Sequence, residues 1–188
     1  MHIKEIEINN FKSFKSKTTI PFLNGFTTIS GPNGSGKSNI VDSVLFALGL
    51  STSRTLRAEK LTDLINNTAS NREASVKITF SSDNDNDSDF TIKRRIKEGN
   101  NGYTSTFYID DRVSTLAEVH KKLSTYNISP GCYNVMMQGD VTGIINMSPF
   151  ERRKIIDELA GVTEFDRRIE QASKELETVQ DRIERSYI

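Results

Sequence analysis

Short stretches of alternating apolar and polar residues open the chain, which is the pattern of β-strands with one buried face. Ile6 and Ile8 alternate with charged neighbours, and residues 18–22 form a second short run. Residues 26–29 are rich in strand-favouring residues and precede a glycine-rich loop. We therefore expect three strands before the loop that begins at Gly31.

Residues 74–113 repeat this alternation and predict an antiparallel sheet. Gly99-Asn-Asn-Gly102 separates two of the runs, as a hairpin loop would. Aspartates alternate within residues 81–89, between two other runs. We interpret this stretch as a solvated loop, because a calcium loop of the EF-hand type needs a terminal glutamate at a spacing that is absent here.

Helical spacing of apolar residues predicts three further elements. From Ser38 onward the apolar residues recur three and four positions apart, up to Gly49, which suits a C-cap. Residues 116–123 predict an amphipathic helix behind Ser114. Ser148-Pro-Phe-Glu151 places Ser at the N-cap, Pro at the first helical position and Glu at the third, which indicates a helix start.

The end of the chain carries an apolar seam that is typical of a coiled coil. Steps of three and four residues alternate along it, which is the spacing of a heptad repeat. The seam consists of Val162, Phe165, Ile169, Ala172, Leu176, Val179 and Ile183. An ordinary surface helix is the alternative, but alternation sustained over about three heptads favours the coiled coil.

Composition adds that part of the chain is expected outside a packed core. The 188 residues are only 35% apolar and 27% charged, which is lean for one fully globular unit. The 25 basic and 25 acidic side chains give a formal net charge of zero. This balance neither requires nor excludes a nucleic-acid partner, because charge placement matters more than its sum.

Several classes of protein are excluded by what the sequence lacks. No apolar run reaches the length of a membrane helix, and the N-terminus leads directly into a strand pattern instead of a secretory signal. The single cysteine, Cys132, excludes a disulfide scaffold and a multi-cysteine metal site, and it fits a reducing cytosol. We therefore expect a cytoplasmic protein without a membrane partner.

A phosphate-binding loop is the strongest chemical motif. Gly31-Pro-Asn-Gly-Ser-Gly-Lys-Ser38 matches G-x-x-x-x-G-K-[ST] between a predicted strand and a predicted helix. Its glycines let backbone N–H groups surround a phosphate, and the helix adds its N-terminal dipole. Lys37 is expected to reach the β- and γ-phosphates, and Ser38 to offer its hydroxyl to Mg²⁺. A glycine-rich turn with a surface lysine is the alternative, whereas the glycine spacing excludes a dinucleotide fingerprint.

Several motifs in a fixed order resemble the N-terminal head segment of the SMC (structural maintenance of chromosomes) ATPases of bacterial or archaeal type. They cover essentially the whole chain and are Phe11-Lys-Ser-Phe14, Gly31-Pro-Asn-Gly-Ser-Gly-Lys-Ser-Asn39 with Asp42, Gln138-Gly-Asp-Val-Thr142, Ser148-Pro-Phe-Glu-Arg-Arg153 and Ile155-Ile-Asp-Glu-Leu-Ala-Gly-Val162. The resemblance implies an α/β fold, the N-terminal half of an ABC-type P-loop ATPase head with an antiparallel β lobe. It assigns this half-head to residues 1–161 and the start of the coiled coil to residues 162–188.

The same resemblance implies ATP and Mg²⁺ as cofactors and assigns residues to them. Gln138 matches the Q-loop glutamine, which contacts Mg²⁺ together with Ser38 and helps to place the attacking water. Arg57 resembles an arginine that reaches the nucleotide and supports hydrolysis, with an exposed loop arginine as the alternative. Lys12 and Ser13 resemble positions near the nucleotide. The loop itself contributes Gly31, Pro32, Asn33, Gly34, Ser35, Gly36, Lys37, Ser38 and Asn39.

Two motifs of a complete ATPase head are absent from these 188 residues. The sequence has no Gly-Gly pair for a signature loop. Ile155-Ile-Asp-Glu158 looks like a Walker B strand, but it follows basic residues inside a predicted helix. In SMC proteins both parts come from the far end of the polypeptide. The resemblance therefore implies half a head, which works with a C-terminal half and with a second head as a homodimer.

The resemblance also implies a kleisin subunit, DNA bound without sequence specificity and a nucleoid-associated location. The whole machine would hydrolyse ATP to condense, organise and segregate chromosomes. Lys93, Arg94 and Arg95 could touch DNA phosphates, but we interpret them as a solvated strand face. Two alternatives stay open: the head of a related coiled-coil DNA-repair ATPase, and a structural or interaction module without activity.

Overall fold

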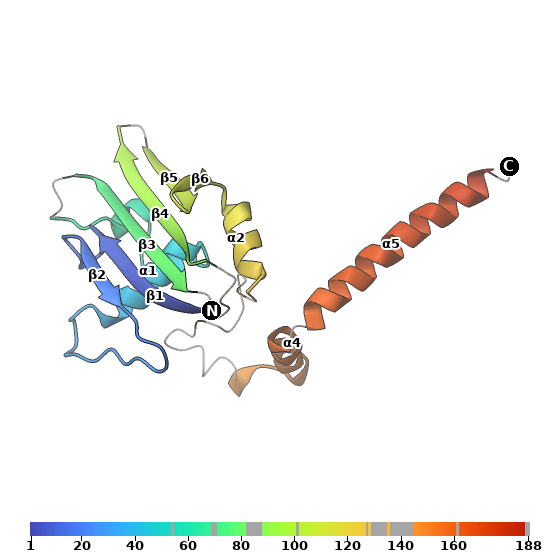
Figure 1. The fold of residues 1–188 in the computed structure, drawn as a ribbon, viewed down its shortest axis with the longest axis horizontal. Coiled ribbons are helices and arrows are strands. Elements are labelled where there is room, and N and C mark those ends of the chain that lie inside the picture. The colour runs from blue at the N-terminus through green and yellow to red at the C-terminus, as the bar shows by residue number, and fades with distance from the viewer. Residues whose placement is uncertain are drawn as a thin grey trace. The chain divides into compact units, whose positions relative to one another are not determined.

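The computed structural model describes residues 1–53, 55–68, 71–81, 88–100, 102–126, 128, 135, 145–160 and 162–186. The chain divides into two compact units, Met1–Gly131 and Cys132–Ile188. The first unit holds the sheet and the phosphate-binding loop, and the second holds the two C-terminal helices (Figure 1).

Antiparallel pairing joins the strands of the first unit into one sheet, in the order β2-β1-β3-β4-β5-β6 (Figure 1). The strands are β1 His2–Asn9, β2 Thr18–Pro21, β3 Glu73–Ser81, β4 Phe90–Gly99, β5 Gly102–Ile109 and β6 Arg112–Ser114. The sheet expected over residues 74–113 is confirmed, and Gly99 pairs with Gly102 where its hairpin turns. Of the aspartate stretch, residues 82–87 lie outside the described residues.

The expected third strand before the loop is wrong. Residues 26–29 lie in none of the described strands, and Phe26 is 93% exposed. A strand needs a neighbour for its backbone N–H and C=O groups, and no strand in the described part of the chain pairs with this segment. Residues 26–29 therefore favour an extended backbone but lack the pairing partner that a strand needs.

Both helices expected in the first unit are confirmed. α1 spans Lys37–Leu48 and ends at Gly49, which has a φ of +66° and donates its N–H to the last-turn carbonyls. α2 spans Leu116–Ser124 and begins one residue later than Ser114 suggests. Its N-cap is Thr115, which forms a reciprocal capping box with Glu118. A short 3-10 helix, η1, covers Leu61–Leu64.

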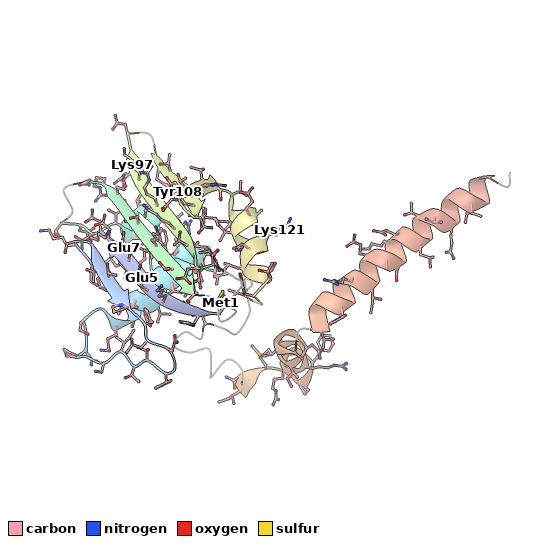
Figure 2. The ribbon with its side chains drawn as sticks, in the orientation of Figure 1. Met1, Glu5, Glu7, Lys97, Tyr108 and Lys121 are labelled. Atoms are coloured by element: carbon pink, nitrogen blue, oxygen red, sulfur yellow. The ribbon has the colours of Figure 1, made fainter. Side chains whose placement is uncertain are left out.

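The core of this unit lies between α1 and one face of the sheet, where α1 packs on β3 and β4 (Figure 1). The alternation along the strands decides which side chains enter it: Ile6, Ile8, Ala74, Val76, Ile78, Phe80, Phe90, Ile92 and Ile96 are all buried. The side chains between them are less buried, as are Glu5 and Glu7 on β1; on β5, Tyr108 is likewise less buried than its neighbour Phe107 (Figure 2). The antiparallel sheet therefore keeps one apolar and one polar face.

The second unit contains α4, Pro149–Leu159, and α5, Val162–Ser186. The helix start predicted at Ser148 is confirmed: Ser148 Oγ accepts from the N–H of Glu151, and Glu151 Oε2 accepts from the N–H of Ser148. The large apolar seam residues of α5 are 41% to 67% exposed. The helix is thus confirmed, and its pairing as a coiled coil stays a prediction.

Candidate functional site

The phosphate-binding loop, residues 31–36, is a largely exposed connection that leads directly into α1. Gly34 and Gly36 have φ angles of +83° and +93°, which L side chains rarely adopt. A Cβ added to Gly36 would also lie 2.8 Å from Ser13 Oγ. Backbone conformation and close approach thus explain these two glycines of the motif.

The start of α1 is suited to an anion. Its N-cap, Gly36, offers no side-chain cap, and the first turn of this fully described helix contains no acidic residue. The first N–H groups and the positive end of the helix dipole therefore face no protein carboxylate from within the helix. Such an end binds phosphate readily.

Lys37 adds a positive charge at the same end. Its Nζ donates to the carbonyl oxygens of Gly31 and Pro32, both at 2.7 Å, so the ammonium is held against the loop. The exposed Ser38 stands beside it in the sequence. The N–H groups and the ammonium are the hydrogen-bond donors that a phosphate needs. The hydroxyl is an oxygen ligand of the kind that Mg²⁺ needs. The residues present therefore fit ATP with Mg²⁺.

The turn after β1 lies next to the first turn of α1. Phe11 is fully buried, packs on Phe46 of α1 with ring centroids 5.0 Å apart, and forms bridges to Phe14 and Ile65. Lys12 is held by its backbone as well, because its N–H donates to the carbonyl of Leu64 at 2.8 Å. The two phenylalanines of Phe11-Lys-Ser-Phe14 thus fix the turn that carries the polar residues Lys12 and Ser13.

Ser13 and Asn39 meet across this contact. Asn39 Nδ2 donates to Ser13 Oγ over 2.9 Å. Because a Cβ on Gly36 would also meet Ser13 Oγ, the structure brings Ser13 and Asn39 to the start of α1. Their part in nucleotide binding stays a prediction.

A buried carboxylate, that of Asp42, binds the two other basic residues predicted near the nucleotide, Lys12 and Arg57. Asp42, on α1, is 1% exposed, and its Oδ2 accepts from Lys12 Nζ and from Arg57 Nη2, each over 2.5 Å. Lys12 Nζ also donates to the carbonyl of Leu56 at 2.6 Å. The cluster Lys12–Asp42–Arg57 therefore ties the turn after β1 and the segment after α1 to the helix that follows the phosphate-binding loop.

Sequence reasoning missed the importance of Asp42. It quoted Asp42 within a motif without giving it a role. The available signal was its spacing, three residues before Leu45 and four before Phe46, both buried on the core side of α1. An acidic residue on an apolar helix face needs a buried counter-charge.

The glutamine assigned to Mg²⁺ and water, Gln138, lies outside the described residues. The Walker-B-like residues 155–158 lie within α4, so they form no strand. Asp157 there forms an ion pair with Arg153 one turn earlier, with Nε and Oδ2 3.5 Å apart. This confirms that the resemblance of the segment to a Walker B strand is only apparent.

The solvated strand face expected for residues 93–95 is confirmed in part and wrong for Arg94. Lys93 and Arg95 are half-buried and lie on the polar face, within 5.8 Å and 6.0 Å of the Tyr108 ring. Arg94 is only 8% exposed. The reason is the alternation of β4, which turns every second side chain toward α1.

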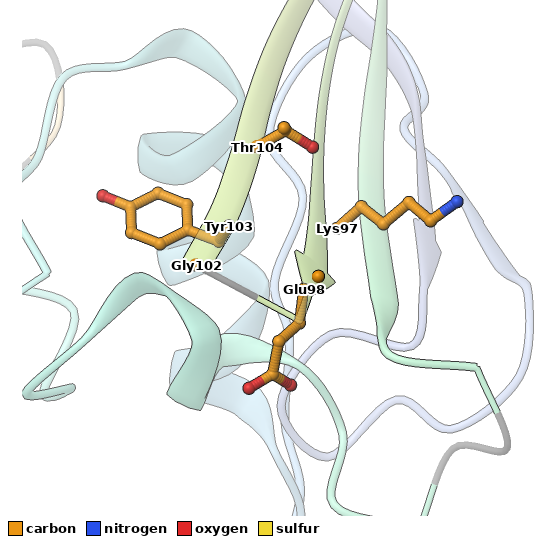
Figure 3. Close-up of a pocket in the computed structure, with 6 residues that line it drawn as sticks. Lys97, Glu98, Gly102, Tyr103 and Thr104 are labelled. Atoms are coloured by element: carbon orange, nitrogen blue, oxygen red, sulfur yellow. The ribbon is translucent and has the colours of Figure 1, made fainter.

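A cavity of about 400 Å³ lies at the hairpin between β4 and β5 (Figure 3). It is lined by Lys97, Glu98, Gly99, Gly102, Tyr103 and Thr104, and none of these is a predicted site residue. Figure 3 shows Lys97 and Tyr103 pointing to opposite sides of the hairpin. These two polar side chains therefore do not converge on one ligand, and the start of α1 is the better candidate site.

No helix in the described residues combines the length and the apolar character that crossing a membrane requires.

Known proteins are similar to this chain over nearly all of its length. The RecF/RecN/SMC N terminal domain family matches residues 2–148, which include the phosphate-binding loop. The chromosome partition protein Smc of Gloeobacter violaceus is 53% identical over 186 residues, which are 98% of this chain and 16% of that protein. The chain thus spans about a sixth of the length of such relatives.

Solved structures of SMC heads have the same fold. The Smc head with an extended coiled coil from Pyrococcus furiosus, bound to the C-terminal domain of ScpA, has a TM-score of 0.81 and 38% identity, covering 98% of this chain and 48% of that one. A structure from work on ATP-driven dimerization and DNA-stimulated activation of SMC ATPases has a TM-score of 0.72 and 37% identity, covering 85% of this chain and 99% of that one.

Proposed function

Because the chain belongs to the SMC family, as the N-terminal region of the head, we propose that it supplies the ATP-binding half of an SMC ATPase head. One observation carries the proposal. The exposed glycine loop holds Lys37 against its own carbonyls and leads into a helix whose first turn has neither a side-chain cap nor an acid. This arrangement is suited to a triphosphate.

The loop residues 31–39 would bind the phosphates of ATP, with Ser38 as an oxygen ligand of Mg²⁺. Bound Mg²⁺ neutralises charge that develops on the phosphates. Ser13 and Asn39, hydrogen-bonded at the start of α1, would fix the approach of the turn after β1 to this site. Gln138 would place the attacking water, and Arg57 would stabilise the departing γ-phosphate.

Hydrolysis needs residues that this sequence does not contain. We assign the Walker B carboxylates and the signature loop to a C-terminal half, and we expect two such heads to enclose ATP as a homodimer. Work on related SMC ATPases describes ATP-driven dimerization and DNA-stimulated activation, and related Smc heads bind domains of ScpA. By analogy, the complete protein would work with a kleisin, bind DNA without sequence specificity, and organise and segregate chromosomes at the nucleoid.

The alternative of a coiled-coil DNA-repair ATPase shares the phosphate-binding loop. The relatives from Gloeobacter violaceus and Synechocystis, at 53% and 49% identity, are both chromosome partition proteins, which favours the SMC assignment. A structural module without activity would not need Lys37, so the tests below separate it from an ATPase.

The first test is ATP binding by a head assembled from this chain and its C-terminal half. Lys37→Ala should weaken binding tenfold or more, because losing a charge-assisted phosphate contact costs about 1.5–3 kcal/mol. Isothermal calorimetry measures the change, and Lys97→Ala, in the hairpin far along the chain, is the matched control. Equal ATP affinity of Lys37→Ala and wild type would contradict the site.

The second test concerns Arg57. Arg57→Ala should leave ATP binding nearly unchanged and lower the turnover rate, because the charge is needed mainly as the γ-phosphate departs. Arginine fingers are worth about 10³–10⁵ in rate, and we expect less where Gln138 and a second head share the task. Wild-type turnover in Arg57→Ala, with and without DNA, would remove Arg57 from the site.

A further inference from the structure

Asp42 holds two of the proposed site residues with one oxygen. Its Oδ2 accepts from both Lys12 Nζ and Arg57 Nη2, and in the described part of the chain its Oδ1 has no hydrogen-bond partner. A carboxylate that is 1% exposed is unfavourable without a counter-charge. Asp42 must therefore keep at least one of the two cations.

The two cations are not held equally. The Lys12 side chain is 13% exposed and has a second acceptor, the carbonyl of Leu56. The Arg57 side chain is 54% exposed, and among the described residues Asp42 is the acceptor found for it. Arg57 can therefore leave while Lys12 still neutralises Asp42, so its departure leaves no buried charge uncompensated.

Arg57 also lies where a movement of its side chain alone is enough for it to leave Asp42. Leu56 beside it is fully buried and anchors the segment, whereas the Arg57 side chain is 54% exposed. Asp42 lies about 6 Å along the α1 axis from Ser38, four residues at the helical rise. Asp42, which holds the guanidinium, thus lies about one helical turn along α1 from the proposed Mg²⁺ ligand Ser38.

We propose that Asp42 is a positioning residue, which holds Arg57 beside α1 and yields it to the γ-phosphate of bound ATP. The inference rests on the proposed function of Arg57. Asp42 and the triphosphate are two anions that compete for one guanidinium, while Lys12 stays with Asp42. In the ground state the cost of separating Arg57 from Asp42 offsets the contact that Arg57 gains with ATP, so Arg57→Ala binds ATP about as wild type does. Removing the Asp42 charge removes the cost, keeps the gain and raises the apparent affinity.

The test removes the negative charge of Asp42 and keeps the shape of its side chain. In the assembled head, Asp42→Asn should lower the KM and the Kd for ATP about threefold or more and leave kcat within about twofold. In the Arg57→Ala background the same substitution should change neither constant. Glu59→Gln, which neutralises an exposed carboxylate two residues from Arg57, is the matched control and should behave as wild type.

The double-mutant comparison separates positioning from structure. An unchanged Kd in Asp42→Asn, or the same change with and without Arg57, would overturn the inference. If Lys37→Ala and Arg57→Ala behave as proposed while Asp42→Asn does not, only the inference fails. If Arg57→Ala equals wild type in both binding and turnover, the assigned role of Arg57 fails and takes the inference with it.

Where Asp42→Asn melts below the assay temperature, because the part-buried ammonium of Lys12 has lost its carboxylate, a second comparison applies. The second comparison is then Asp42→Asn/Lys12→Met against Lys12→Met alone, in which any contribution of Lys12 to nucleotide binding cancels. In Lys12→Met, Arg57 is the remaining cation of Asp42 and is held more tightly, so the double variant should bind ATP more than threefold more tightly than Lys12→Met. Equal or weaker binding would overturn the inference.

Discussion

Two buried charged residues define the surroundings of α1 at the scale of single side chains. Asp42 lies near its start with Lys12 and Arg57, and Arg94 lies against its last turn. Arg94 donates to the carbonyl of Phe46 and to Ser105 Oγ. A cation at the C-terminal end of a helix is favourable for the helix dipole. The charge of Arg94 therefore stabilises the C-terminal end of the helix that follows the phosphate-binding loop.

Arg94 is held mostly by packing. Its guanidinium lies 4.6 Å from the ring centroids of both Phe46 and Phe107, and it has no carboxylate partner among the described residues. Burial lowers the pKa of Arg94 to about 10, so the residue still carries its charge at neutral pH. The contact thus joins β4, β5 and α1 through one side chain.

Truncating Arg94 should destabilise the fold. Arg94→Ala is expected to cost about 2–4 kcal/mol of unfolding free energy, because it removes a buried side chain between two rings and leaves a cavity. Arg94→Met keeps most of the volume without a buried charge and should cost less than half as much. Urea denaturation measures both. Equal losses would show that the charge matters more than the packing.

At the scale of secondary-structure elements, local capping interactions determine where the helices begin and end. α1 ends at Gly49 with a φ of +66°, and α2 begins with the capping box of Thr115 and Glu118. His120 of α2 lies within hydrogen-bond distance, 3.2 Å, of the carbonyl of Gly49. The end of α1 therefore also contributes to the placement of α2.

Gly49→Ala tests the end of α1. Alanine in the left-handed region costs about 1–2 kcal/mol, and its Cβ would lie 2.4 Å from Leu116 Cδ1, so that side chain must also move. A loss of at least that size is expected in thermal or urea unfolding. Gly99→Ala is the control, since its Cβ would meet nothing closer than 3.9 Å. Equal stabilities of the two variants would contradict this account.

The start of α2 should respond to acid. The backbone N–H and the hydroxyl of Thr115 donate to Glu118 and lower the pKa of this carboxyl below its ordinary 4.5. A lowered folded-state pKa contributes stability above the ordinary value, and this contribution is lost as the pH falls through the folded-state value. Glu118→Gln lacks the contribution at every pH. The stability gap between wild type and Glu118→Gln should therefore close on acidification below pH 4.5, and a constant gap would argue against the capping box.

At the scale of the whole molecule, the protein joins an α/β unit to a helical unit, Met1–Gly131 and Cys132–Ile188. The exposed segment with Leu23 and Phe26 leads to the phosphate-binding loop, and the exposed seam of α5 carries Phe165 and Ile169. Contiguous exposed apolar residues mark surfaces that other chain segments cover. This agrees with a half-head that functions together with further polypeptide.

The isolated chain should not turn over ATP. Residues 1–188 contain the phosphate-binding loop but no Walker B strand and no signature loop, so the water would lack its catalytic carboxylate. Phosphate release by a clean preparation should equal background, and adding the C-terminal half should raise it. Steady turnover by residues 1–188 that Lys37→Ala abolishes would contradict the half-head proposal.

The sequence by itself determined those features whose causes are local. The phosphate-binding motif, the caps at Gly49 and Ser148, and the alternation of β3, β4 and β5 each depend on residues adjacent in the chain. Backbone conformation, side-chain capping and strand periodicity act over a few residues, so a pattern is enough to predict them.

Only the tertiary structure decided which distant residues meet. It left residues 26–29 without a strand partner, gave the inward-facing Arg94 the end of α1 as its partner, and brought Lys12, Asp42 and Arg57 together from three segments. These outcomes depend on pairing and burial between segments that lie 15 to 48 positions apart, where the spacing in the sequence carries no signal. A buried charge takes whichever counter-charge the fold places beside it, because the interior offers it no water.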